Sequence, residues 1–182
     1  MRLARLLPLV AVLVAPTAAA EARPFTIVAH GSATTFGEVR AIGDFRPVSD
    51  PTYGAALEVF GDPDAERSGF RGTSCRVSWH RRGLKIAFAN FGGGSACNPA
   101  LGRSQSARAY GKRWRTARGL GVGDGVGRLG DRYPRATRHG RVWWLVTAVS
   151  RIGETRRYPV LAATVRGGRV RSFSLFIGAA GD

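Results

Sequence analysis

The sequence contains no apolar run long enough to cross a bilayer as a helix. The run from Leu6 to Ala15 is well short of the ~20 residues that a spanning helix needs, and no second segment of spanning length follows. Arg2 and Arg5 precede this run and small residues follow it, which is the order of a secretory signal peptide. We therefore expect residues 1–20 to be a signal peptide, cleaved after Ala20 or Ala22. We expect the mature protein to be secreted or extracytoplasmic in the cell envelope, without a membrane span.

Cysteine is scarce as well. The two cysteines, Cys75 and Cys97, form an isolated pair. In an exported chain such a pair is most simply a disulfide. A redox or metal-binding pair would be expected at C-x-x-C spacing or beside a histidine cluster, and neither pattern occurs. The sequence predicts a structural disulfide, no metal site and no cofactor.

Acidic residues are missing from the middle of the chain. Residues 21–66 carry eight acids and three arginines, whereas residues 67–123 carry twelve basic residues and no acid. The net charge of the whole chain is +16, which favours attraction to acidic partners or polyanions. Arginine outnumbers lysine 26 to 2, and codon usage in a GC-rich genome explains such a bias equally well. Both interpretations of the charge stay open.

Residue patterns for common catalytic chemistry are missing too. The three histidines form no H-E-x-x-H motif and no pair of ligands four residues apart. The segment GGSAC at 93–97 lacks the final glycine of G-x-S-x-G, and the glycines of 119–127 do not fit G-x-G-x-x-G. The acids Asp62, Asp64 and Glu66 fall where we expect an exposed loop. The chain is therefore not expected to be an enzyme.

What is present is one pattern used twice. Ser49 or Asp50 can cap a helix with Pro51 in its first turn. Apolar residues at helical spacing form one face of that helix, and Gly61 ends the helix. The residues of this face are Tyr53, Ala56, Leu57 and Phe60. A hairpin follows, in which Cys75, Val77 and Trp79 alternate on one strand and Leu84, Ile86 and Phe88 on the next, across Arg81-Arg82-Gly83.

In the second half, residues 122–124 open a similar helix that Pro134 stops. Strands are predicted at 142–148, 160–165 and 170–177, the last two joined by a Gly167-Gly168 turn. The fold class is α+β, with two tandem helix-plus-antiparallel-sheet halves after a cleaved signal peptide. The predicted divisions are a signal peptide (1–20), an N-terminal strand segment (21–47), a first half (48–97), a basic connection (98–118) and a second half (119–182).

This order of short capped helix and antiparallel strands resembles the tandem-repeat architecture of the β-lactamase inhibitory protein family. It is also similar to a small envelope-assembly lipoprotein domain built on one such unit. The strings GLGVGDGVGRLGDRYPRA and CRVSW and the Trp143-Trp144 strand further resemble uncharacterised exported proteins of GC-rich bacteria. The resemblance covers roughly residues 48–91 and 119–178. Unlike those families, this chain has one candidate disulfide, in the first half, and no lipidation cysteine. The resemblance implies non-catalytic binding through a sheet surface, and no inhibitory residue is carried over.

A mixture of cations and aromatic residues marks the candidate interaction surface. Trp143 and Trp144 are adjacent on a predicted strand, so their side chains point to opposite faces, one packed and one on the open sheet. The remaining candidates lie in the acid-free stretch: Arg81, Arg82, Arg113, Trp114 and Arg115. For Trp114 a position in the core is the alternative to a position on the surface, and the sequence leaves both open.

Three functions remain. The first is an exported, non-enzymatic binding protein whose exposed sheet face meets a protein partner, including an enzyme that it inhibits. The second is an envelope-associated binder of an anionic polymer through the arginine-rich surface, without specific nucleic-acid recognition. The third is an extracellular hydrolase, for which the sequence offers no catalytic constellation.

Overall fold

The computed structural model describes residues 25–30, 33–38, 43–45, 52–150 and 156–176. The predicted signal peptide, both cleavage positions and the predicted cap at 49–51 lie outside these residues. Within them the chain has two α-helices and is mostly sheet, which is a mixed α+β arrangement. Neither helix is long or apolar enough to cross a membrane.

An eight-stranded antiparallel sheet makes up most of the structure. Its strands in spatial order are β4 (Ala65–Ser68), β5 (Ser74–Trp79), β6 (Leu84–Ala89), β7 (Arg103–Ala109), β12 (Arg169–Phe176), β11 (Arg156–Arg166), β10 (Val142–Ser150) and β9 (Thr137–His139). Helix α1 (Tyr53–Phe60) precedes β4 along the chain, and helix α2 (Val126–Arg132) precedes β9. Each helix is thus followed by four strands of this sheet, and the pairing of β7 with β12 joins the two sets.

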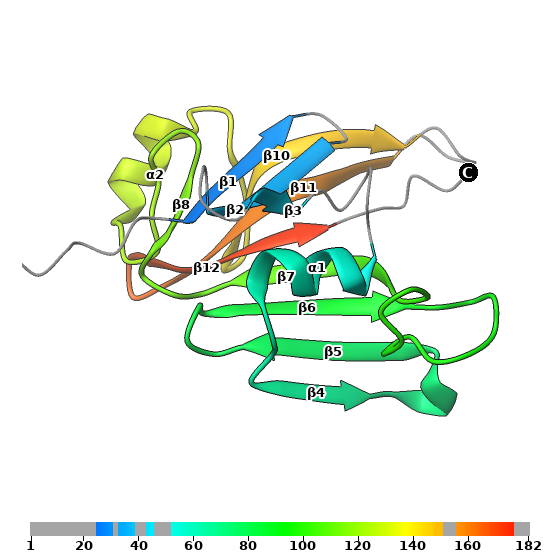
Figure 1. The fold of residues 1–182 in the computed structure, drawn as a ribbon. Coiled ribbons are helices and arrows are strands. Elements are labelled where there is room, and N and C mark those ends of the chain that lie inside the picture. Colours follow the sequence, from blue (N-terminus) through cyan, green and yellow to red (C-terminus); the bar gives the residue numbers. More distant parts are fainter. Residues whose placement is uncertain (1–24, 31–32, 39–42, 46–51, 151–155, 177–182) are drawn as a thin grey trace, which may run out of the picture.

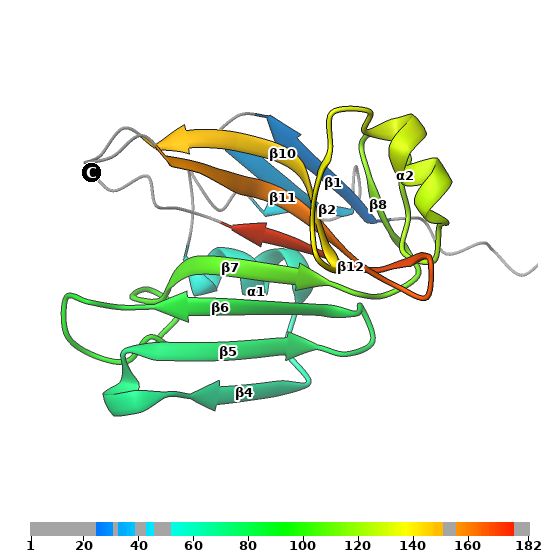
Figure 2. The same cartoon turned by 180° about the vertical axis from the view of Figure 1, so that it is seen from behind.

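A second, four-stranded sheet covers part of the first. Its strands in order are β3 (Gly43–Phe45), β2 (Ala33–Glu38), β1 (Phe25–His30) and β8 (Trp114–Thr116), and β1 and β8 run parallel. Helix α1 and the four-stranded sheet lie on the same side of the eight-stranded sheet (Figure 1). The view from behind shows the opposite face, over which no described helix or strand runs (Figure 2). We call the covered side the core face and the other side the open face.

Helix α1 begins and ends where its sequence dictates, with one correction. Thr52, rather than Ser49 or Asp50, is the N-cap, and its side chain accepts a hydrogen bond from the Ala55 amide at 3.1 Å. Gly61 ends the helix at a φ of 70°, a conformation that glycine adopts readily. Tyr53 and Phe60 are buried, and burial of each such side chain stabilises the fold by about 1.5–3 kcal/mol. Leu57, predicted on the same face, is half-buried.

The hairpin that follows confirms the predicted alternation. The six alternating residues predicted for β5 and β6 all lie in the core, and Gly83 turns the chain at a φ of 63°. The predicted disulfide is present: Cys75 in β5 is bonded to Cys97 in the loop after β6, with the two Cα atoms 5.1 Å apart. Glu66, expected in a loop, instead belongs to edge strand β4, and a single turn of 3₁₀-helix (Phe70–Gly72) links β4 to β5.

Residues 98–118 differ from the irregular basic connection that the sequence predicted. They contain β7, at the middle of the eight-stranded sheet, and β8. The inward side chains of β7 are small, namely Ser104, Ala107 and Ala109. Small side chains contribute little to hydrophobic periodicity. The alternation of inward and outward residues in this strand therefore cannot be recognised from the pattern of large apolar residues.

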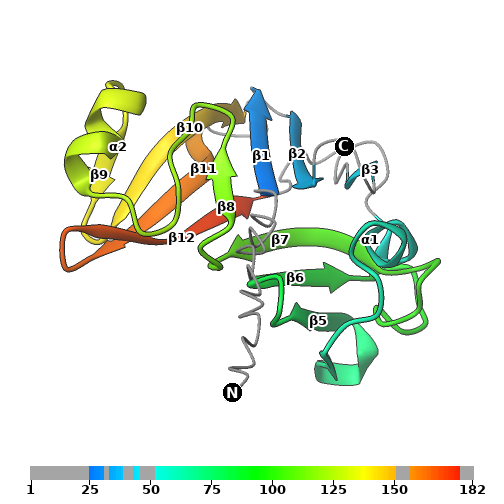
Figure 3. The ribbon, with the colours of Figure 1, turned by 60° about the vertical axis from the view of Figure 1, so that its left-hand side comes forward.

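The residues from 119 to 176 follow the predicted helix and strands closely. Leu129 of α2 and Tyr133 are buried, and the Tyr133 amide closes the helix on the Leu129 carbonyl at 2.8 Å. Gly167 and Gly168 form the turn between β11 and β12 with φ values of 60° and 67°, which suit a two-residue hairpin turn. Helix α2 lies beside this turn, since the Val126 amide donates to the Gly168 carbonyl at 2.9 Å, and Figure 3 shows it at one end of the sheet.

Candidate functional site

Strand register places one row of residues across the entire open face. Residues directly opposite each other on neighbouring strands have side chains on the same face. From β4 to β9 the row contains Ala65, Ser78, Lys85, Arg108, Ser174, Ala162, Trp144 and Thr137. A second row, parallel to the first, contains Arg67, Arg76, Ala87 and Ser106. In the part of the sheet from β4 to β12, five of these positions are alanine or serine, so only small side chains cover the backbone there.

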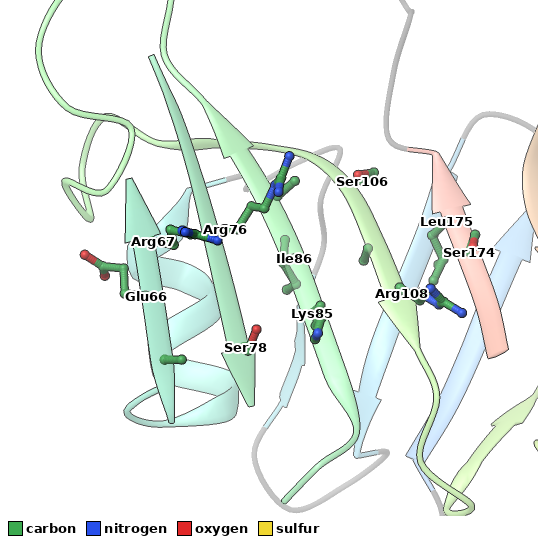
Figure 4. Close-up of a pocket in the computed structure, with 13 residues that line it drawn as sticks. Glu66, Arg67, Arg76, Ser78, Lys85, Ile86, Ser106, Arg108, Ser174 and Leu175 are labelled. Carbon is green, nitrogen blue, oxygen red and sulfur yellow. The ribbon is translucent and has the colours of Figure 1, made fainter. Parts of the chain in front are cut away.

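These two rows line a shallow hollow of about 540 Å³ in the part of the sheet formed by β4, β5, β6, β7 and β12. We call it the cationic hollow and define it by its open-face residues Arg67, Arg76, Lys85 and Arg108 together with Ala65, Ser78, Ala87, Ser106 and Ser174. Figure 4 shows these side chains on successive strands. All four cations are exposed, and Ser106 and Ser174, on β7 and β12, are half-buried. The hollow is therefore a floor of small side chains bordered by four positive charges.

The hollow follows from the alternation that builds the core. In β5, Cys75 and Val77 point inward, so Arg76 and Ser78 point outward. In β6, the inward position of Ile86 leaves Lys85 and Ala87 on the open face. The charged residues are thus the outward half of strands whose inward half is apolar.

The cations of the hollow form two like-charged pairs. Arg67 of β4 lies directly opposite Arg76 of β5, and Lys85 of β6 lies directly opposite Arg108 of β7. Arg108 donates a hydrogen bond from Nε to Ser172 Oγ at 3.1 Å, which holds its stem on the sheet. Like charges in direct cross-strand register are destabilising, so this face accumulates positive charge at the expense of stability.

One carboxylate borders the hollow, and it is turned away. Glu66 accepts a hydrogen bond from the Tyr53 hydroxyl at 2.6 Å on the core face. Figure 4 shows Glu66 on the opposite side of β4 from Arg67. Burial, followed by the hydrogen bond to Glu66, raises the pKa of the Tyr53 phenol above its ordinary value. Glu66 is thereby engaged with helix α1 and not with the four cations.

The structure separates Trp143 from Trp144. Trp143 packs against the core cluster. Trp144 lies in the same open-face row as Lys85 and Arg108, and its ring stacks on His139 with the ring centroids 3.9 Å apart. Both indoles are half-buried. Trp144 is therefore the candidate that carries the open-face row onto β10.

The other candidates are not brought together with it. Trp114 is fully buried and donates from Nε1 to the Arg82 carbonyl at 2.7 Å, so its indole is part of the core. Arg82 in turn donates from Nε to the Phe60 carbonyl at 3.0 Å at the end of α1. Arg113 is half-buried with its guanidinium 4.3 Å from the centre of the Phe25 ring. These three residues join α1, the hairpin turn and the small sheet.

Arg81 and Arg115 are exposed, but neither lies in the two open-face rows. Arg81 is in the turn between β5 and β6, and Arg115 is in β8 of the small sheet. The predicted basic surface is therefore divided among different parts of the described structure.

Side chains that could hold a metal ion gather in one place among the described residues. Glu66, Cys75 and Cys97 have ligand atoms within 4.8 Å of one another. The two sulfurs are bonded to each other, and a disulfide sulfur is not the thiolate that binds metals. This cluster does not make a metal site.

Sequence reasoning missed the residues of the cationic hollow. The signal for Arg76 and Lys85 was present, because each stands between two residues predicted to point inward. Arg67 and Arg108 carried no such signal, since β4 is short and entirely exposed and β7 has small inward side chains. Strand pairing alone brings the four together.

Comparisons of the chain with protein-family models, with curated proteins and with solved structures find no match. Its function is therefore inferred from its own residues and their geometry.

Proposed function

We propose that this chain is an exported, non-enzymatic binding protein that contacts a protein partner through the open face of its eight-stranded sheet. The single observation that carries the proposal is the composition of that face. Two cross-strand rows place small side chains, four cations and Trp144 on a face over which no described helix or strand runs. Interfaces favour arginine and aromatic residues, and a concave face with a thin floor admits a protruding segment of another protein.

Export is supported by the signal-peptide pattern of residues 1–20 and by the disulfide, since disulfides persist in oxidising compartments. The tandem organisation is supported by strand order: α1 with β4–β7 and α2 with β9–β12 are successive sets of one helix and four antiparallel strands. The sequence resemblance to an inhibitor family implies non-catalytic binding through a sheet surface. Inhibition of an enzyme is accordingly the form of binding that we propose first.

The test is a capture experiment with the oxidised chain and a variant whose hollow is filled. Ala87→Tyr places a large ring in the centre of the cationic hollow, and Ala117→Tyr adds the same ring at an exposed position after β8. The proteins are immobilised, exposed to the extracellular and envelope fraction of the source organism, and washed at low and then high salt. We expect one protein to survive the high-salt wash on the wild type and on Ala117→Tyr, and to be lost from Ala87→Tyr.

Equal capture by both variants would contradict the open-face proposal. The second candidate function, binding of an anionic envelope polymer, is favoured by the twelve basic residues of 67–123 without an acid. It predicts capture of polymer alone, released as the salt concentration rises, because counterion screening weakens such binding steeply.

A further inference from the structure

We infer that the partner segment received by the cationic hollow is an acidic peptide segment, whose carboxylates lie between the Arg67–Arg76 and Lys85–Arg108 pairs. This inference rests on the proposed function and names the chemistry of the partner. It begins with the two like-charged pairs, each in direct cross-strand register on one face. Such an arrangement is unfavourable in the free protein, and an anion placed between the two pairs relieves it.

The described part of the chain does not supply that anion. The one carboxylate among the described lining residues, Glu66, accepts the hydrogen bond from Tyr53 on the core face. The ion pair found among the described residues, Arg128–Asp124, is at helix α2, outside the hollow. The counter-charge for the four cations therefore has to arrive with a ligand.

The lining of the hollow favours a peptide over a sugar polymer or a nucleic acid. Ser78 lies directly opposite Lys85, and Ser174 lies directly opposite Arg108. Together with Ser106 of β7 they offer hydroxyl groups beside the cations, and the rest of the floor is alanine and backbone. Among the residues whose side chains the structure describes, no aromatic one lines the hollow, whereas recognition of single-stranded nucleic acids uses aromatic rings on which the bases stack. Guanidinium groups and serines instead suit carboxylates, which accept several hydrogen bonds at once.

A neighbouring hollow offers a contact site for an apolar residue at the end of the partner segment. It has a volume of about 370 Å³, shares Arg67 and Arg76 with the cationic hollow, and continues to Phe70. The Phe70 side chain is 76% exposed, with the Arg71 guanidinium 4.9 Å from its ring centre. An acidic segment that ends in an apolar residue would contact both hollows.

The test measures peptide binding to the oxidised chain by fluorescence anisotropy at about 0.15 M salt. The probes are fluorescein-labelled GDEDEDG, its amide-matched counterpart GNQNQNG, and GDEDEDL. The protein variants are Arg67→Ser/Arg76→Ser and a control, Lys112→Ser/Arg135→Ser, which removes two exposed charges outside the hollow. Both double variants lose two positive charges. A difference between them therefore reports binding at the hollow, and not the general attraction of a basic protein for acidic peptides.

We expect GDEDEDG to bind and GNQNQNG not to bind. Loss of two exposed charge contacts should weaken GDEDEDG binding roughly tenfold in Arg67→Ser/Arg76→Ser and less than about twofold in the control. GDEDEDL should bind more tightly than GDEDEDG, and Phe70→Ser should remove that difference. Equal weakening in the two double variants would overturn the inference, as would tighter binding of inorganic polyphosphate than of either acidic peptide.

The outcome is separable from that of the proposed function. A partner lost from Ala87→Tyr and retained by Arg67→Ser/Arg76→Ser would leave the open face as the binding site and overturn the acidic segment. Charge-dependent peptide binding at the hollow, with no protein captured in the first experiment, would support the chemistry and contradict the protein-partner function.

Discussion

The hydroxyl of Tyr53 in helix α1 donates a hydrogen bond of 2.6 Å to Glu66 in edge strand β4. This contact ties the helix to the outermost strand of the eight-stranded sheet. Burial and the neighbouring carboxylate raise the pKa of the Tyr53 phenol, and burial is also the main cause of the raised pKa values of Tyr110 and Tyr133. All three therefore remain protonated in the folded protein at pH values where an unfolded tyrosine, with a pKa near 10, ionises.

A group whose pKa is raised on folding stabilises the protein below its unfolded pKa and loses that contribution as the pH rises towards its folded pKa. We expect the free energy of unfolding to fall as the pH rises above about 10. Tyr53→Phe should make this fall shallower, while lowering stability at pH 7 by about 1 kcal/mol through loss of the hydrogen bond. Urea titrations between pH 7 and 11 measure both effects. An identical alkaline slope in the variant would contradict the assignment to Tyr53.

The disulfide should contribute strongly to stability. Cys75 and Cys97 are 22 residues apart, and closing a loop of that size stabilises the folded state by about 3 kcal/mol. Cys75→Ser/Cys97→Ser should lose about this amount in denaturant unfolding. Reduction of the wild type should have the same effect, and reducing agent should not change the double variant. A wild type whose unfolding midpoint is unaffected by reduction would count against this prediction.

The end of helix α1 depends on the hairpin that follows it. Arg82 Nε donates to the Phe60 carbonyl, and Trp79 Nε1 donates to the Gly61 carbonyl at 2.8 Å. Arg82→Met removes one of these hydrogen bonds and should destabilise the protein by about 1 kcal/mol. Arg81→Met changes the neighbouring, exposed residue and should stay within about 0.5 kcal/mol of the wild type. Thermal unfolding of the two variants side by side distinguishes them, and equal melting temperatures would contradict a capping role for Arg82.

The like-charged pair Arg67–Arg76 leads to a prediction of opposite sign. Replacing Arg76 by Gln removes one member of a directly opposed pair, so it should increase the stability of the free protein by about 0.2–1 kcal/mol at low salt. The gain should shrink at about 1 M salt, where charges are screened within about 3 Å. Unfolding midpoints at the two salt concentrations test this. Destabilisation at low salt would contradict the prediction, because it would mean that another group of the chain already neutralises the repulsion between the two arginines.

The two adjacent tryptophans should behave differently. Trp143→Ala removes a ring packed against the core and should cost about 3 kcal/mol of stability. Trp144→Ala removes a ring on the open face, so the variant should stay closer to wild-type stability and lose affinity for the captured partner. Equilibrium unfolding and the capture experiment together measure the two effects. A Trp143→Ala variant that stays stable but loses binding would contradict the assignment of Trp143 to the core face and Trp144 to the open face.

The sequence allowed the prediction of elements whose inward side chains are large. The Cys75-Val77-Trp79 alternation, the Gly61 helix end and the Gly167-Gly168 turn are each determined by a few neighbouring residues, and the structure confirms them. The core position of Trp79 follows from the same alternation. These features depend on local chemistry, which a single sequence displays directly.

What could not be predicted depends on pairing between distant strands. β7 looks like a polar connection because its inward residues are small, and β8 is too short to show any period. The cationic hollow needs β4, β5, β6, β7 and β12 in register before its four cations share one face. The sequence around Trp114 suits a surface and a core position equally. Trp114 is in the core because β8 pairs in parallel with β1, which brings the Trp114 ring to 4.8 Å from the ring of Phe25.

The position of β12 in the sheet has a consequence for the timing of folding. β12 is the last described strand in chain order, yet it lies near the middle of the sheet, between β7 and β11. Its pairing of Phe173 with Ala109 joins residues that are far apart in the chain, and such contacts form late and slowly. The ribosome must release β12 before the eight-stranded sheet can close. A chain that enters a translocation channel before β12 has left the ribosome therefore enters it with the eight-stranded sheet still open.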